Sequence, residues 1–297
     1  MSEDAYELVL MPVVRDLFQH LNRLVLIGGW VPELHRRFGG HGDWAVKPLK
    51  TIEVDILVAG SEEAGPLASA LESSGFVPVG ESGVSAVWER DVRVGERIEF
   101  FVAHAGVWEE LGTVDALDAE ARLGGLRLSD MGVLRDKSVT LSVPLDTREG
   151  RATLIDVRVP EIGAFLIHKR ATFRRRPDSA KAAKDLHYIV DVMQSSEALV
   201  EAIERQIAAY CEEGTDAAEL ARRARNHLGV FIRESSTTDV RTRLAGGLSE
   251  RHSLTQEAAD ARAVGFLTDF RDLIPEVGGR RGTTEIGEPG ASIADPP

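Results

Sequence analysis

Two neighbouring segments constrain the fold more than any other part of the sequence. Residues 24–30 (LVLIGGW) are an apolar run too short for a helix that ends in two glycines, which predicts a strand and a tight turn. Residues 51–58 (TIEVDILV) alternate with the period of a strand, so that Glu53 and Asp55 share one face. The sequence therefore predicts an acidic strand beside a glycine turn.

The turn and the acid pair each have a functional interpretation. Trp30, Leu34 and Phe38 have helical spacing and predict a helix directly after the turn. Gly28 and Gly29 would let backbone N–H groups approach a ligand, and the positive end of that helix suits a phosphate. Two nearby carboxylates repel each other unless a cation lies between them, and Mg²⁺ suits this role. The alternative is an edge strand whose acids face solvent.

A third acidic residue lies in a later predicted strand. Residues 97–102 (RIEFFV) are apolar except for Arg97 and Glu99. A carboxylate in a central strand is costly unless a metal or a basic partner offsets its charge. Glu99 therefore either joins the two acids at a metal site or forms a salt bridge with Arg97 or Arg90 at a sheet edge.

Basic residues gather in the next part of the chain, where seven Lys or Arg between residues 168 and 184 accompany a single acid. Pro160 suits the first turn of a helix whose apolar stripe includes Lys169, a counter-charge for phosphate or a lysine that reaches the surface along its stem. A second helix, capped by Asp178 or Ser179, has one polar face. That face consists of Lys181, Lys184, Asp185 and Tyr188. A solvated surface is the ordinary alternative for such a charge run.

Composition excludes several classes of protein. A hydrophobic fraction of 43% in 297 residues supports one large domain or two ordinary ones. The net charge of −13 argues against a protein that coats nucleic acid nonspecifically. The single cysteine, Cys211, excludes an intrachain disulfide framework. An acidic start without a signal peptide and no apolar run of membrane-spanning length lead us to expect a cytoplasmic protein.

The remaining pattern predicts an α+β fold, with a mixed sheet core and flanking helices followed by a helical C-terminal half. Further strands are expected at 76–79, 84–88, 125–128, 138–143 and 152–159, and helices at 5–21, 61–74, 196–211, 216–228, 237–244 and 253–273. Capping-box spacing occurs at Asp216/Glu219 and Ser253/Gln256, and residues 39–50 should form a mobile loop. We expect an α/β core at 1–159, a helical domain at 160–277 and a disordered tail at 278–297.

A glycine pair after a strand, an acid-x-acid strand and a third acid on a later strand resemble the nucleotidyltransferase superfamily with the DNA polymerase β-like core. The runs 164–176 (AFLIHKRATFRRR) and 183–188 (AKDLHY) are similar, more narrowly, to the AbiEii family, the toxins of type IV toxin–antitoxin systems. The resemblance covers roughly residues 5–195. It implies a nucleotidyltransferase fold for the mixed sheet and its helices.

The resemblance also implies roles for individual residues. Gly28, Gly29, Lys50, Thr51 and Lys184 would bind the nucleotide, Glu53, Asp55 and Glu99 would bind Mg²⁺, and Glu99, Lys169 and Asp185 would act in catalysis. This sequence differs from the usual family pattern in three respects. It has Glu53 in place of aspartate and Gly29 in place of serine, and a long segment separates the turn from the acids.

The implied function is Mg²⁺-dependent transfer of a nucleoside monophosphate from an NTP to a hydroxyl group. In an AbiEii-like setting the acceptor is RNA, such as a tRNA end, or a protein, and a cognate antitoxin is a partner. Two alternatives stay open: a binding or regulatory module of the same fold without turnover, and a nucleotidyltransferase that modifies a small molecule such as an aminoglycoside.

Overall fold

The structure is a computed structural model. It describes residues 6–41, 44–49, 51–58, 64–80, 84–90, 96–103, 114–118, 122–128, 130–146, 152–172, 178–213, 215–233 and 238–276. Lys50, predicted to bind nucleotide, and the predicted tail at 278–297 lie outside these residues.

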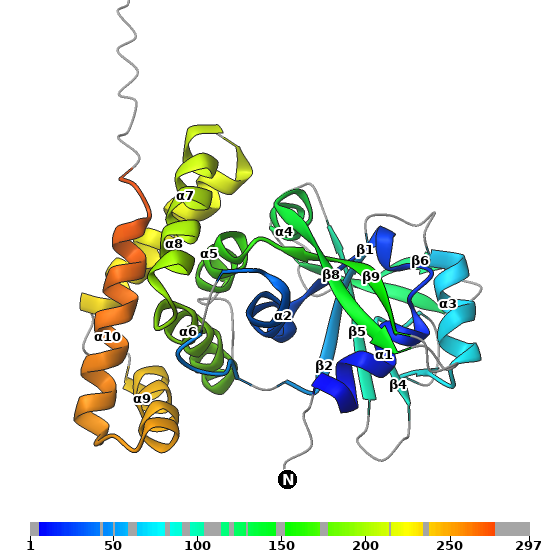
Figure 1. The fold of residues 1–297 in the computed structure, drawn as a ribbon, viewed down its shortest axis with the longest axis horizontal. Helices are drawn as coiled ribbons and strands as arrows, with labels where there is room; N and C mark the ends of the chain where they lie inside the picture. The colour runs from blue at the N-terminus through cyan, green and yellow to red at the C-terminus, as the bar shows by residue number, and fades with distance from the viewer. Residues whose placement is uncertain are drawn as a thin grey trace, which may run out of the picture.

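The fold is α+β, as predicted, with one mixed sheet followed by a run of helices (Figure 1). The strands are β1 (Leu24–Ile27), β2 (Glu53–Val58), β3 (Val77–Pro78), β4 (Val87–Arg90), β5 (Glu96–Ala103), β6 (Val114–Asp118), β7 (Leu123–Leu128), β8 (Ser138–Asp146) and β9 (Ala152–Pro160). The helices are η1 (Tyr6–Leu10), α1 (Met11–Asp16), η2 (Leu21–Arg23), η3 (Gly28–Trp30), α2 (Val31–Phe38), α3 (Ala64–Ser73), α4 (Met131–Asp136), α5 (Ile162–Thr172), α6 (Ser179–Met193), α7 (Glu197–Glu213), α8 (Asp216–Arg233), α9 (Thr238–His252) and α10 (Gln256–Leu273).

The two acidic strands lie inside the sheet. The order of strands is β3-β4-β5-β2-β1-β9-β8, with β6 on β7 and β7 also on β5. β2 runs antiparallel to β1 and parallel to β5, in a register that places Asp55 opposite Glu99. The edge-strand alternative is therefore wrong for both strands, because each has a hydrogen-bonded neighbour on either side.

Strand alternation decides which layer each side chain enters. One core packs the sheet against the C-terminal helices and contains Val25, Ile27, Leu57 and Phe101. The residues between them on the same strands, such as Ile56, enter a second core on the opposite face. The three acidic residues have the odd-numbered parity of Leu57 and Phe101, so they face the layer of α5 and α6. Figure 1 shows these helices between the sheet and the rest of the helical half.

The helical half agrees with the predicted sequence of helices, with two local corrections. Of the two predicted caps of α6, Asp178 is the one that the structure shows, and its Oδ1 accepts the Ala180 N–H at 2.8 Å. Pro160 ends β9, because it pairs with Ser138 of β8, and the helix begins only at Ile162. Thr255, and not Ser253, caps α10 by accepting the Ala258 N–H at 3.2 Å.

The N-terminal segment and the stretch after α2 also differ from expectation. The single helix predicted at 5–21 is a π-helical turn followed by the short α1, and the chain turns before η2. Between residues 39 and 50, the His41 carbonyl accepts the Ser196 hydroxyl at 2.8 Å, and Trp44 and Leu49 pack on the core of the helical half. These contacts hold His41, Trp44 and Leu49 to the helical half, within the range for which the sequence predicted a mobile loop.

Two elements, β6 and α4, were not predicted, and the division into two domains at residue 159 stays a prediction.

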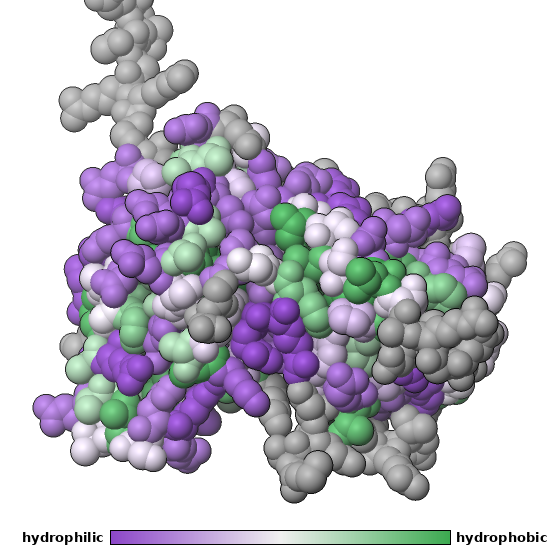
Figure 2. Space-filling view, viewed as in Figure 1, coloured by the Kyte–Doolittle hydropathy of each residue, from purple (hydrophilic) through white to green (hydrophobic). Residues whose placement is uncertain are grey.

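None of the described helices has both the length and the apolar character that a membrane span requires. Hydrophilic and apolar residues mix over the face shown in Figure 2, with small apolar patches near the position of β8 and β9. The exposed Leu154 belongs to β9.

Candidate active site

A cavity of about 360 Å³ separates the acidic face of the sheet from α5 and α6. Its lining includes all the predicted site residues that the structure describes. These are Gly28, Gly29, Thr51, Glu53, Asp55, Glu99, Lys169, Lys184 and Asp185. The sheet contributes the carboxylates and the turn, and the two helices contribute the lysines and Asp185. The roles of these residues stay predictions, but the fold brings them into one place.

The glycine turn fits closely against the acidic strand. Gly28 has φ +71°, and a Cβ atom there would lie 1.8 Å from Asp55 Oδ2. The Trp30 indole Nε1 donates a 2.9 Å hydrogen bond to the Glu53 carbonyl and fixes the turn against β2. Gly28 thus meets two requirements at once: a left-handed backbone and contact with a carboxylate without a side chain between them.

We predict that Gly28→Ala destabilises the protein more than Gly40→Ala does. Gly40 has φ +69°, and a Cβ there would meet nothing within 4 Å, so its substitution costs only backbone strain, about 1–2 kcal/mol. Gly28→Ala adds the displacement of Asp55, roughly a further 1–3 kcal/mol. Urea unfolding of both variants measures the difference. Equal losses would show that contact with Asp55 contributes nothing to the requirement for glycine.

Asp55 has a strongly raised pKa. Its pKa is raised to about 7: burial raises it most, the nearby Lys169 lowers it, and Glu99 and Glu53 raise it. The carboxylate sits next to two others in a poorly solvated cavity, so ionising it is unfavourable without added positive charge. Such a perturbed acid in a cleft is typical of a functional site.

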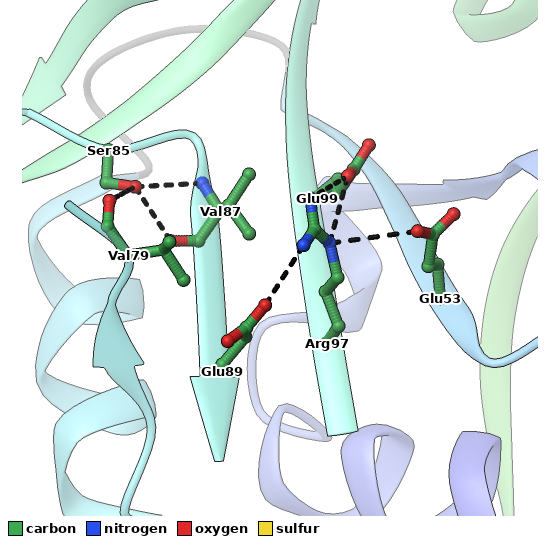
Figure 3. Close-up of polar contacts among 7 residues, drawn as sticks. All are labelled: Glu53, Val79, Ser85, Val87, Glu89, Arg97 and Glu99. Atoms are coloured by element: carbon green, nitrogen blue, oxygen red, sulfur yellow. Dashed lines mark hydrogen bonds and ion pairs between the residues drawn. The ribbon is translucent and has the colours of Figure 1, made fainter. Parts of the chain in front are cut away.

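Arg97 places positive charge beside the other two acids, Glu53 and Glu99, as Figure 3 shows. Its guanidinium donates to Glu99 Oε1 at 2.8 and 3.1 Å and to Glu89 Oε1 at 3.0 Å. Its Nε also lies 3.7 Å from Glu53 Oε1. The salt bridge from Glu99 to Arg97 was one of the two alternatives read from the sequence, and it is present although β5 is a central strand.

The acids fit a Mg²⁺ ion only in part. Among the described residues, no group of three His, Cys, Asp or Glu side chains is arranged to hold a metal ion. Glu99 is already bonded to Arg97. Mg²⁺ needs only one or two carboxylates when phosphate and water complete its octahedron, and Glu53 and Asp55 face the same cavity. Glu53 and Asp55 would hold such an ion, and Glu99 would join them only by releasing Arg97.

The opposite wall of the cavity is basic. Lys169 Nζ lies 2.9 Å from Asp185 Oδ1, and these two side chains are 12% and 6% exposed. Burial lowers the pKa of Lys184, and the nearby Lys169 lowers it further. Lys181 also lines the cavity. Desolvated ammonium groups opposite a carboxylate cluster offer counter-charges to a phosphate chain bound between them.

Sequence reasoning did not assign a role to two parts of this site. Tyr188 was placed on the polar face of α6, but nothing in the pattern showed that its hydroxyl would meet Gly29. The apolar part of the lining was not predicted as one surface, because it comes from separate elements. It includes Phe101, Leu126, Leu128, Met131, Leu134 and Phe165.

An acid-bearing sheet that faces lysines across a cavity has the chemistry of an enzyme that acts on phosphates. Residues 19–208, more than half of the chain, match a nucleotidyltransferase family. The chain belongs to this family. Comparisons with curated proteins and with solved structures gave no match.

Proposed function

We propose that this protein transfers a nucleoside monophosphate from an NTP to a hydroxyl group of RNA, such as a tRNA end, with a protein hydroxyl as the alternative acceptor. The observation that carries the proposal is the cavity itself. Glu53, Asp55 and Glu99 line one side of it, and Lys169 and Lys184 line the other. Family membership supports the same reaction class.

Residues of both walls of the cavity take part in this reaction. The acceptor oxygen attacks the α-phosphorus, the bond to the β-phosphate oxygen breaks, and pyrophosphate leaves. Lys169 and Lys184 offset the charge that grows on the leaving group. Glu99 takes the proton of the acceptor hydroxyl, and Gly28 allows the triphosphate to approach the backbone. A Mg²⁺ ion held by Glu53 and Asp55 would stabilise charge on the attacking and leaving oxygens.

The AbiEii-like part of the proposal rests on the sequence motifs around Lys169 and Asp185. In that setting the protein is a toxin, and a cognate antitoxin would bind it. The basic side chains of α5 and α6 favour RNA over a cationic small molecule, because phosphates and not ammonium groups would be attracted to this wall. An aminoglycoside would have to bind the acidic wall instead.

A binding module without turnover is the second candidate, and the ion pairs of the site favour it. Arg97 holds Glu99, and Lys169 is paired with Asp185, so two groups needed for chemistry already have partners. Such a protein would bind nucleotide and transfer nothing.

Incubation with each labelled NTP, Mg²⁺ and an acceptor tests these candidates. We expect wild type to label total RNA and Glu53→Gln to lose at least about 100-fold in rate. Separate reactions with an aminoglycoside and with protein extract identify other acceptors. Binding of NTP without transfer to any acceptor would establish the module, and labelling that survives in Glu53→Gln would contradict the assignment of the acidic wall.

A further inference from the structure

The hydroxyl of Tyr188 occupies an unusual position in the cavity. Tyr188 is 1% exposed, and among the residues that the structure describes its hydroxyl has no hydrogen-bond partner. The same side chain lines the cavity. A buried hydroxyl that makes no hydrogen bond is costly, on the order of 1–3 kcal/mol, and its presence calls for a functional reason.

The position of this hydroxyl relative to the glycine turn is well defined. A Cβ atom on Gly29 would lie 2.4 Å from the Tyr188 hydroxyl oxygen and 2.9 Å from Thr51 Cγ2. The hydroxyl therefore fills the space in which a side chain at position 29 would otherwise begin. Gly29 is required here because Tyr188, from a helix far along the chain, reaches the turn.

The surroundings of Tyr188 are those of an anion site. The Nζ atoms of Lys169 and Lys184 lie 5.5 and 5.9 Å from the centre of its ring. Phe165 packs against the ring edge-on, with 5.9 Å between the centroids, and holds it in place. The hydroxyl thus points to the turn from a rigid ring flanked by two cations.

We propose that the Tyr188 hydroxyl donates a hydrogen bond to a phosphate oxygen of the nucleotide triphosphate at the Gly28–Gly29 turn. The inference rests on the proposed function, since it needs a triphosphate in this cavity. Burial and the neighbouring Asp185 and Asp55 raise the pKa of Tyr188, so the phenol stays protonated and can donate. Tyr188 is then a nucleotide-binding residue that recognises phosphate and is indifferent to the base.

Base-free tripolyphosphate is the probe that isolates this contact. With Mg²⁺ present, we expect Tyr188→Phe to weaken its binding about ten- to hundredfold in calorimetry, the cost of one hydrogen bond to a charged group. Phenylalanine preserves the ring and its contact with Phe165. Binding of NTPs should weaken by the same factor, because the contact is to phosphate. Tyr210→Phe is the control for loss of a buried tyrosine hydroxyl, since Tyr210 donates to Glu161 and does not line the cavity.

A second variant places a hydroxyl at position 29 in place of the one on Tyr188. Gly29→Ser alone should bind poorly, because its Cβ meets the Tyr188 oxygen. Gly29→Ser combined with Tyr188→Phe removes that oxygen and supplies a serine hydroxyl in nearly the same place. We expect the double variant to bind tripolyphosphate more tightly than Tyr188→Phe, and this recovery would not follow if Tyr188 were merely structural.

The possible results separate this inference from the proposed function. If wild type binds neither tripolyphosphate nor any NTP, both fail. If wild type binds and Tyr188→Phe binds equally well, the inference alone is overturned. A loss for NTPs without a loss for tripolyphosphate would place the hydroxyl on the sugar or base and also overturn the inference. An equal loss in Tyr210→Phe would overturn it as well.

Discussion

Replacing Asp55 with asparagine should stabilise the folded protein at about pH 8 while abolishing nucleotidyl transfer. The ionised Asp55 side chain destabilises the folded protein, because its carboxylate is desolvated and adjoins Glu99 and Glu53. Asparagine keeps the shape of the side chain and removes the charge. We expect a gain of about 1–3 kcal/mol in the free energy of unfolding, less than the full pKa shift implies, because the cavity admits water.

The gain should depend on pH in a defined direction. The pKa of Asp55 is about 7 in the folded protein, whereas its ordinary value of 3.8 applies to the unfolded chain. The folded state therefore binds more protons than the unfolded state between these two pH values. Wild-type stability therefore falls as pH rises through this window. The advantage of Asp55→Asn should be absent near about pH 4, grow up to about pH 7 and stay constant above it.

Urea unfolding of wild type and Asp55→Asn at several pH values, without Mg²⁺ or nucleotide, measures this advantage. The difference between the two proteins is the quantity to follow, because burial also raises the pKa of Asp191 to about 6 and lowers that of His35 to about 4. Those effects are common to both proteins and cancel. A variant that is less stable than wild type at all pH values would show that Asp55 is a structural acid.

The site could be predicted from the sequence where its geometry follows from local periodicity. Strand alternation places Glu53 and Asp55 on one face, and helical spacing places Lys184 and Asp185 beside each other on α6. Both patterns depend only on residues that are close in sequence, so they do not change with the tertiary arrangement of the chain. That the two faces meet across a cavity follows from topology, and only the resemblance to a known family supplied that step.

Other features could not be predicted because they depend on contacts between distant segments. The sequence offered Arg97 as one possible partner of Glu99, but its position among Glu53, Glu89 and Glu99 requires the register of three strands. The contact of Tyr188 with Gly29 joins residues on a late helix and an early turn. The composition of the segment after α2 is polar and glycine-rich and therefore predicts a loop, although Trp44 and Leu49 pack on the helical half.

Lys169→Met should both destabilise the protein and stop transfer. Lys169 is the cation 2.9 Å from the nearly buried Asp185, and removing one member of such a pair leaves a charge in a poorly solvated place. We expect a loss of about 2–4 kcal/mol in the free energy of unfolding. Transfer should fall at least about 100-fold, because an ammonium group facing the leaving pyrophosphate is lost. Chemical unfolding and labelled-NTP transfer assays measure the two effects.

The double variant Lys169→Met/Asp185→Asn separates the structural effect from the catalytic one. It removes both charges, so most of the stability should return while transfer stays low. Recovered transfer would mean that Lys169 acts only by neutralising Asp185.

Lys184→Met is the matched comparison, because the two lysines share a cavity and differ in their partners. Lys184 has a pKa lowered by burial and by Lys169, so its charge is unfavourable where it lies. Replacing it should leave stability unchanged or raise it, yet still weaken transfer, because its role depends on a bound phosphate and not on a partner within the protein. If Lys169→Met lowers stability, Lys184→Met does not, and both lower transfer, then Lys169 stabilises the site through its ion pair and both lysines bind the nucleotide. If Lys184→Met destabilised the protein as much as Lys169→Met, the charge of Lys184 would be needed for folding, and its proposed role in binding would lose this support.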